Sequence, residues 1–137
     1  MTNDEMDNID RQLAEWPMGL EICVDKPFYG VWVKGPGETE WWLFSPTRSI
    51  VQAMMVAEKM RELGWDLQLN SESNSPYIPE KPWYADFSKI KTRQNHRPQE
   101  YESHDYIWIR EATPELAISL AAKAVKDSLK EEDGEGE

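Results

Sequence analysis

Apolar residues recur every three to four positions in three segments of the chain, the spacing that lines one face of a helix. The first segment follows the capping pattern Thr2-x-x-Glu5 and ends before Pro17. The second follows Ser49 and stops at Gly64, a residue suited to the turn after a helix. These boundaries predict two helices, and the buried stripe of the second is expected to be Ile50, Ala53, Met54, Ala57, Met60 and Leu63.

A third helical segment opens with Thr113 and Pro114, which are typical of the cap and first turn of a helix. Its apolar stripe runs from Leu116 to Val125 and is rich in alanine, so this helix is expected to approach a sheet closely. After Leu129 the chain becomes strongly acidic and too polar to offset the entropy of ordering. We therefore expect one domain over residues 1–129 and a disordered acidic tail over residues 130–137.

Five shorter segments have the alternation or apolar composition of strands, namely residues 29–33, 40–44, 65–69, 83–87 and 106–109. A glycine-containing turn at residues 34–37 joins the first two, which are expected to pair antiparallel. The last is apolar on both faces and indicates an interior strand. The order α-β-β-α-β-β-β-α predicts an α+β fold with three helices and a largely antiparallel sheet of about five strands. The alternation leaves open whether helices cover one face of the sheet or both.

The net charge and the cysteine content limit the binding partners and the cellular compartment that we expect for this protein. The net charge of −11 repels nucleic acid and anionic membranes, and it favours basic partners. The single cysteine, Cys23, excludes an internal disulfide and fits a reducing compartment. The N-terminus has neither the basic region nor the apolar stretch of a secretion signal, and there is no long apolar run. A cytoplasmic protein is expected, in the host cell if a phage encodes it.

Several motifs, taken in order, resemble the phage ABA sandwich domain family, small proteins of phages and prophages. The matching signals are Met18-Gly19, Trp42-x-Phe44-Ser45-Pro46-Thr47, Ala53-x-x-Val56-x-Glu58-Lys59-Met60-Arg61-x-x-Gly64-Trp65, Trp83-x-Ala85-x-Phe87 and Ala112-Thr113-Pro114-x-Leu116-Ala117-Ile118. They span roughly residues 5–126. The resemblance implies a three-layer α/β/α sandwich with helices on both sides of the sheet. It assigns no chemical role to any residue, so no site can be transferred.

The chain departs from the family pattern at Met54, at Ser119 and over residues 88–104, which are longer than expected. This long segment holds the one basic cluster of the sequence, made up of Lys89, Lys91, Arg93, His96 and Arg97. Arginine side chains can grip anionic oxygens, and Tyr84, Tyr101 or Trp108 can offer stacking surfaces. A small anionic ligand such as a nucleotide is one interpretation of this cluster. A solvated loop that balances local acidity is the other.

The sequence holds no motif for catalysis. Cys23 has no histidine near it in the chain, and a buried structural role is expected for it. Glu100, Glu102 and His104 would share one face of an extended stretch and could ligate a divalent metal together with His96. The pattern is short and nonspecific, so exposed polar residues are the favoured interpretation, and we expect neither a metal nor a cofactor. Trp41 and Trp42 must point to opposite faces of a strand, so a helix, a dimer mate or a ligand has to cover one of them, and a helix is expected.

These observations favour a phage or prophage accessory protein that is not an enzyme and that binds a host protein or a small anionic ligand. Interference with host defence is the setting that such a protein would fit. Three alternatives stay open. The first is sequestration of a nucleotide-type signal by residues 89–97, the second is an enzyme that acts on such a nucleotide, and the third is a structural or virion-associated homo-oligomer.

Overall fold

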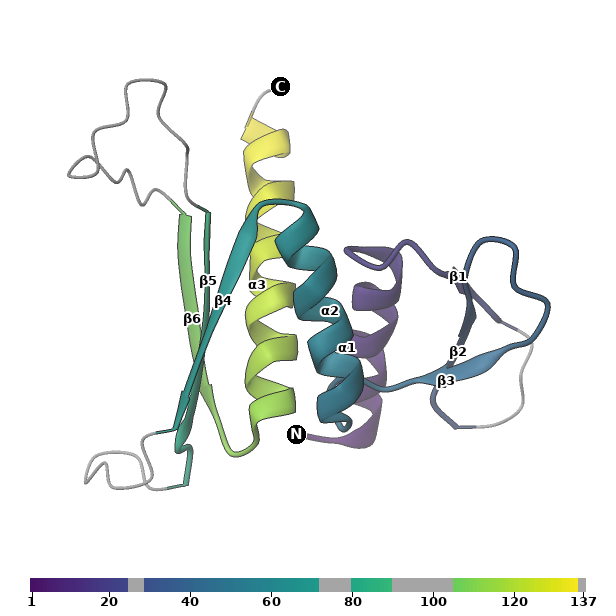
Figure 1. The fold of residues 1–137 in the computed structure, drawn as a ribbon, viewed down its shortest axis with the longest axis horizontal. Helices are drawn as coiled ribbons and strands as arrows, with labels where there is room; N and C mark the ends of the chain where they lie inside the picture. The colour runs from purple at the N-terminus through teal and green to yellow at the C-terminus, as the bar shows by residue number, and fades with distance from the viewer. Residues whose placement is uncertain (25–28, 72–79, 90–104, 136–137) are drawn as a thin grey trace.

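The computed structural model describes residues 1–24, 29–71, 80–89 and 105–135. Within these ranges the chain forms three helices and six strands (Figure 1). They are α1 (Asn3–Glu15), β1 (Glu21–Ile22), β2 (Val31–Lys34), β3 (Trp42–Phe44), α2 (Ile50–Glu62), β4 (Trp65–Ser71), β5 (Trp83–Lys89), β6 (Asp105–Glu111) and α3 (Pro114–Glu135). None of the helices in these ranges is long and apolar enough to cross a membrane.

The strands form two separate sheets, so the prediction of one sheet of about five strands was wrong. One sheet has the order β1-β2-β3 and the other β4-β5-β6, and all neighbours are antiparallel. Figure 1 shows the helices between the two sheets, which gives layers of strands, helices and strands instead of helices on both sides of one sheet. Strand β3 ends at Phe44, α2 runs from Ile50 to Glu62 in the helical layer, and β4 then begins the second sheet at Trp65 on the other side of the helices (Figure 1).

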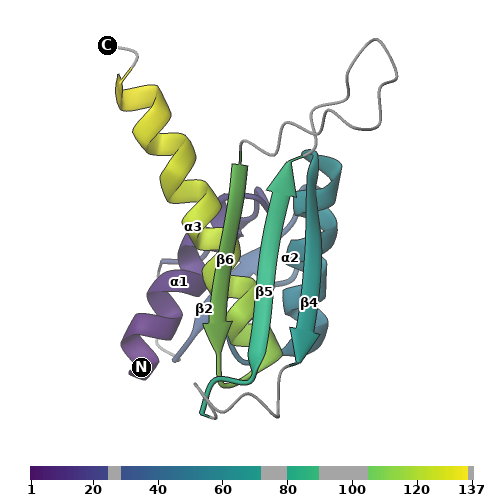
Figure 2. The ribbon, with the colours of Figure 1, turned by 90° about the vertical axis from the view of Figure 1, so that its left-hand side faces the viewer.

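The larger sheet, β4-β5-β6, has one covered face and one open face (Figure 2). Its strands pair along their whole length, with Leu67 opposite Phe87 and Phe87 opposite Ile107 on the helix-facing side. The alternation of the sequence predicts one wetter face for β4 and β5. Strand β4 has such a face, whereas in β5 Asp86 on the open face is buried together with Ala85 and Phe87. The interior position predicted for residues 106–109 was wrong, because β6 is the edge strand among the described strands of this sheet and its Trp108 is 51% exposed on the open face.

The core lies between the helices and the two sheets. Helix α3 packs on β5, β6 and α2, while α1 packs on α3 and on the small sheet. Several alanines of α3 are fully buried, including Ala117 and Ala121, so its backbone comes close to the sheet as predicted. The largest fully buried side chains are Phe44 and Phe87, one from each sheet.

Helix caps lie where the sequence predicts them. The hydroxyl of Thr2 accepts a hydrogen bond from the Glu5 amide at 3.1 Å, and Ser49 accepts one from Gln52 at 3.3 Å. Thr113 caps α3 in the same way, through the Leu116 amide at 3.3 Å. Helix α3 runs on to Glu135, past the predicted domain boundary at residue 129, so residues 130–135 are helical where the sequence predicts a disordered tail.

Candidate functional site

The predicted ligand-binding residues are only partly described by the structure. Lys91, Arg93, His96, Arg97 and Tyr101 lie outside the described residues, as do Glu100, Glu102 and His104. Lys89 and Tyr84 lie on opposite faces of β5. The Lys89 ammonium lies 5.7 Å from the ring centroid of Trp65, beside α2, whereas Tyr84 lies on the open face of the sheet. The structure therefore does not place these two side chains in one site.

The open face of the larger sheet carries a cluster around Tyr84. Its ring stacks on Trp108 with centroids 5.8 Å apart, and the Arg110 guanidinium lies 5.7 Å from its centroid. Beside them Asp86 is only 2% exposed, and its Oδ2 has no hydrogen-bond partner among the described residues. Burial raises the pKa of this carboxyl, and a hydrogen bond with Tyr84 partly opposes the rise. Because Oδ2 is covered, a ligand would have to displace neighbouring side chains to reach it.

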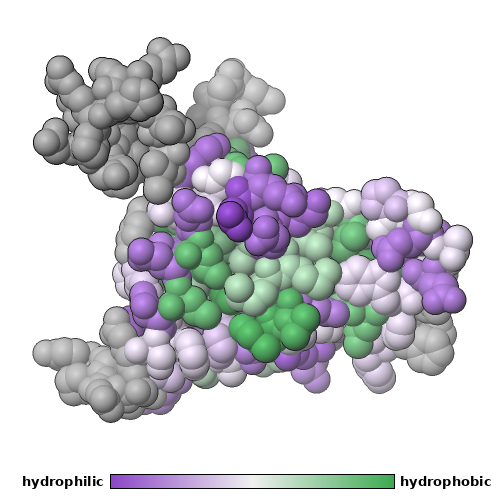
Figure 3. Space-filling view, viewed as in Figure 1, coloured by the Kyte–Doolittle hydropathy of each residue, from purple (hydrophilic) through white to green (hydrophobic). Residues whose placement is uncertain are grey.

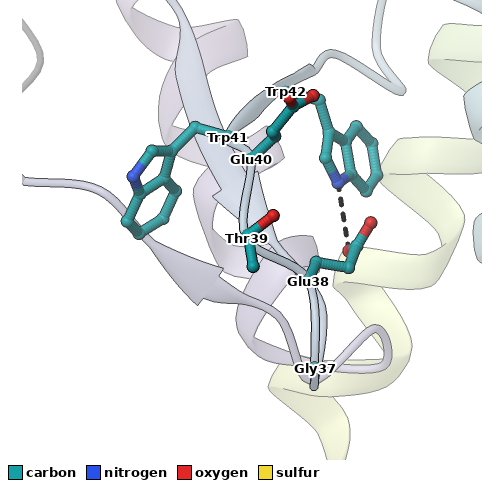
Figure 4. Close-up of a pocket in the computed structure, with 6 residues that line it drawn as sticks. All are labelled: Gly37, Glu38, Thr39, Glu40, Trp41 and Trp42. Atoms are coloured by element: carbon teal, nitrogen blue, oxygen red, sulfur yellow. Dashed lines mark hydrogen bonds between the residues drawn. The ribbon is translucent and has the colours of Figure 1, made fainter.

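A hollow of about 360 Å³ lies at the turn between β2 and β3 (Figure 4). Its two indoles point to opposite sides, with Trp42 packed edge-on against Phe44 at 5.9 Å. The Glu38 carboxylate accepts hydrogen bonds from the Gly35 amide and from Trp42 Nε1. Trp41 lies under the Lys34 ammonium, 4.7 Å from its ring centroid, so a lysine covers this ring where a helix was expected. The polar groups of this hollow thus stabilise the turn itself.

Helix α2 presents apolar side chains to solvent over its first half, and we call this surface the α2 face. It consists of Ile50, Val51, Met54 and Met55, which are 41%, 70%, 47% and 39% exposed. Figure 3 shows hydrophobic side chains gathered over α2 on the front of the molecule. Soluble monomers seldom expose a contiguous apolar patch of this kind unless a partner covers it.

The α2 face corrects the buried stripe predicted for this helix. Ala53, Ala57 and Met60 are buried as predicted, but Val56 is buried as well. Ile50, Met54 and Leu63, which were assigned to the core, are 41%, 47% and 45% exposed. The sequence itself indicates that some of these residues are exposed. Apolar residues occur on every side of the first two turns of α2, and one packed face cannot bury them all.

Hydrogen bonds hold the start of α2 in place. The side-chain amide of Gln52 donates to the Leu43 carbonyl at 2.9 Å and accepts from the Ser45 amide, which ties α2 to the end of β3. The fully buried Asp10 of α1 accepts hydrogen bonds from the amide and the hydroxyl of Thr47, both at 3.0 Å. The α2 face is therefore displayed on a fixed support.

Burial affects the Asp10 carboxyl strongly. Desolvation raises its pKa from 3.8 to about 6, and the two hydrogen bonds from Thr47 only partly oppose this rise. Arg48 lies close by and forms an ion pair with Asp7 at 2.7 Å. Asp10 thus supports the α2 face structurally, and it lies too deep to contact a ligand.

The side chains of the α2 face can make apolar contacts with a partner. Beyond Met55 the same side of the helix becomes charged, with Glu58 paired to Arg61 at 3.6 Å and Glu62 paired to Lys59 at 3.2 Å. In the part of the chain that the structure describes, no three side chains of metal-ligating type cluster together. An apolar surface beside a charged one is typical of protein–protein contact.

The chain has the fold of a known phage protein. The crystal structure of a phage protein from Bacillus cereus ATCC 14579 superimposes on it with a TM-score of 0.55, covering 85% of this chain and 87% of that one at 17% sequence identity. No family model and no curated protein matches the chain. The comparison at this identity supports the fold, and the resemblance to the phage ABA sandwich domain family has no support from a family model.

Proposed function

We propose that this protein is a phage or prophage accessory protein that acts by binding a partner protein through the α2 face. The observation that carries the proposal is the exposure of four apolar side chains on one side of a helix that is otherwise well fixed. Burying them against a partner would gain about 25 cal/mol per Å² of apolar surface. Met54 and Met55 suit such a contact because flexible thioether side chains adapt to irregular partners.

Charge favours a basic partner. The chain has a net charge of −11, while the charged residues next to the α2 face are two ion pairs, Glu58 with Arg61 and Glu62 with Lys59, so the preference comes from the overall charge. An acidic surface speeds association with a basic protein and slows association with acidic ones. A host protein with a positive net charge and an apolar patch is the partner that we propose. Non-enzymatic interference with host defence is the setting that we infer from the fold shared with a phage protein.

Affinity capture from bacteria that express the tagged chain tests this proposal. The double variant Val51→Glu with Met54→Glu is expected to lose the captured partner, because two carboxylates would have to be buried in an apolar contact. Leu63→Glu is the matched control, since Leu63 has similar exposure at the far end of the helix. Proteins recovered equally by wild type, double variant and control would contradict the proposal.

The same variants separate a host partner from a second copy of this chain. If α2 faces bind each other, light scattering will give a dimer mass for the wild type and a monomer mass for the double variant, and this would replace the host partner by a homo-oligomer. Sequestration of a nucleotide through residues 89–97 stays a prediction, and no observation on the described residues favours it.

A further inference from the structure

Strand β6 ends the larger sheet, and helix α3 reaches beyond it. In an antiparallel sheet, alternate residues of an edge strand direct their N–H and C=O groups away from the sheet, where they can pair with another strand. Figure 2 shows α3 crossing behind β6 and continuing past this edge. The helical layer is thus wider than the three strands of the described sheet that it covers.

A groove of about 490 Å³ lies between the edge and the helix. Leu120, Ala124 and Asp127 border it from α3, at helical spacings of four and three that place them on one side of the helix. Ile109 and Glu111 border it from β6. The small side chain of Ala124 leaves space where a further strand would direct an apolar residue toward α3.

The groove differs in charge from the rest of the molecule. Its acidic residues are matched by lysines, with Lys81 paired to Glu111 at 3.4 Å and Lys123 paired to Asp127 at 2.7 Å. On the open face Trp108 is 51% exposed at the strand that forms the edge. A strand beside β6 would place a side chain next to this indole, a cross-strand contact that stabilises sheets.

We propose that β6 binds an extended segment of a partner protein, which joins the sheet as a fourth strand and covers the groove. The segment has alternating character. Residues that face α3 are aliphatic and contact Leu120 and Ala124, and residues on the other face are aromatic or β-branched and contact Trp108. Since both acidic residues of the groove are paired with lysines and Arg110 also lines it, the segment need not be basic. This surface lies at the opposite edge of the sheet from β4 and α2, so it is separate from the α2 face.

A second copy of this chain fits the edge poorly. Pairing two β6 strands about a twofold axis would bring both α3 helices to the same side of the joined sheet. Each helix continues past its own β6, so the two would compete for the space under the new strand (Figure 2). Two chains of net charge −11 would also repel each other.

The test uses the full chain and a displayed library of random dodecapeptides. Selected peptides should show period-two alternation of apolar residues, and their backbone-amide NMR shifts should centre on β6 and on residues 120–127. N-methylation of the peptide backbone gives the sharper result. Two versions of a peptide are compared, one N-methylated at its odd positions and the other at its even positions. One version should lose binding and the other should keep it, because only alternate N–H groups face the edge strand.

Variants of the protein check the groove. Ala124→Phe fills it and should weaken the selected peptides at least about tenfold, a loss of about 1.4 kcal/mol. Lys130→Phe adds the same ring to an exposed position of α3 outside the groove and should leave the affinity unchanged. The proposal is overturned if no peptide is enriched, or if N-methylation at odd and at even positions has the same effect. It is also overturned if Ala124→Phe binds the selected peptides as tightly as wild type does.

Discussion

At the scale of single residues, Asp10 shows how a buried polar group can fix a fold at an energetic cost. Its carboxylate joins α1 to the turn before α2 through Thr47, a residue 37 positions away in sequence. Burial raises its pKa to about 6, so the folded state holds a proton that the unfolded chain releases near pH 4. Stability from this group is therefore complete at low pH and is lost as the pH rises.

This shift predicts a specific pH dependence. A pKa raised from 3.8 to about 6 corresponds to about 3 kcal/mol lost between acid and neutral pH. About 1.4 kcal/mol of that loss falls between pH 5 and pH 7.5. Asp10→Asn keeps an acceptor for the Thr47 amide and cannot ionise. The free energy of unfolding of this variant, relative to that of the wild type, should therefore rise by about 1.4 kcal/mol from pH 5 to pH 7.5.

Urea denaturation of both proteins at each pH measures the difference. Asp7→Asn is the control, because it breaks the ion pair with Arg48 and affects Asp10 only through the smallest of the causes that shift its pKa, the charge of Asp7. A difference between wild type and Asp10→Asn that does not change with pH would show that the carboxyl titrates normally in the folded protein.

At the scale of elements, the end of α2 depends on one backbone conformation. Gly64 has a φ of +97° between α2 and β4, in the region that L-residues avoid. A Cβ at this position would lie 3.6 Å from Lys89 Cε, an ordinary contact, so backbone strain is the main penalty of a substitution. Gly64→Ala should lower the free energy of unfolding by about 1 kcal/mol.

Gly64→Asn should cost less than Gly64→Ala, because asparagine adopts positive φ more readily than alanine. The two variants have side chains of different size, so equal or reversed losses in urea denaturation would point to crowding at Lys89 instead of backbone strain. The comparison thus tests whether conformation alone requires a glycine here.

Helix limits and caps could be read from the sequence because their causes are local. Thr2, Ser49 and Thr113 each bond to an amide three residues ahead, and the residue pattern contains both partners. The pairing of strands is a different problem. The alternation of residues 40–44 and 65–69 does not indicate whether these segments share a sheet. The two-residue strand β1 is too short to produce a recognisable pattern.

The candidate surfaces were harder to predict for the same reason. Ile50 and Met54 fit a buried helical stripe, and only the packing of α2 shows that Val56 is buried and that they are not. Trp108 was placed in an interior strand because its neighbours Ile107 and Ile109 are apolar. Its exposure follows from the position of β6 at a sheet edge, which is a property of the whole sheet.

At the scale of the whole molecule, charge opposes compactness. The net charge of −11 includes five carboxylates over residues 131–137, and removing those residues leaves −6. Helix α3 runs to Glu135 and has no basic residue in its last turn. Acidic groups at the C-terminal end of a helix interact unfavourably with its dipole, so the acidic composition of the end of α3 is unfavourable for this helix end.

The molecule should therefore become more stable as salt is added. Raising NaCl from about 0.01 M to about 0.15 M shortens the screening length from about 30 Å to about 8 Å, which weakens repulsion across the domain more than it weakens close pairs such as Arg48 and Asp7. The thermal midpoint should rise, and a chain ending at Lys130 should show a smaller rise from a starting midpoint that is equal or higher. If the shortened chain began at a clearly lower midpoint, the last turns of α3 would instead contribute contacts that outweigh their charge.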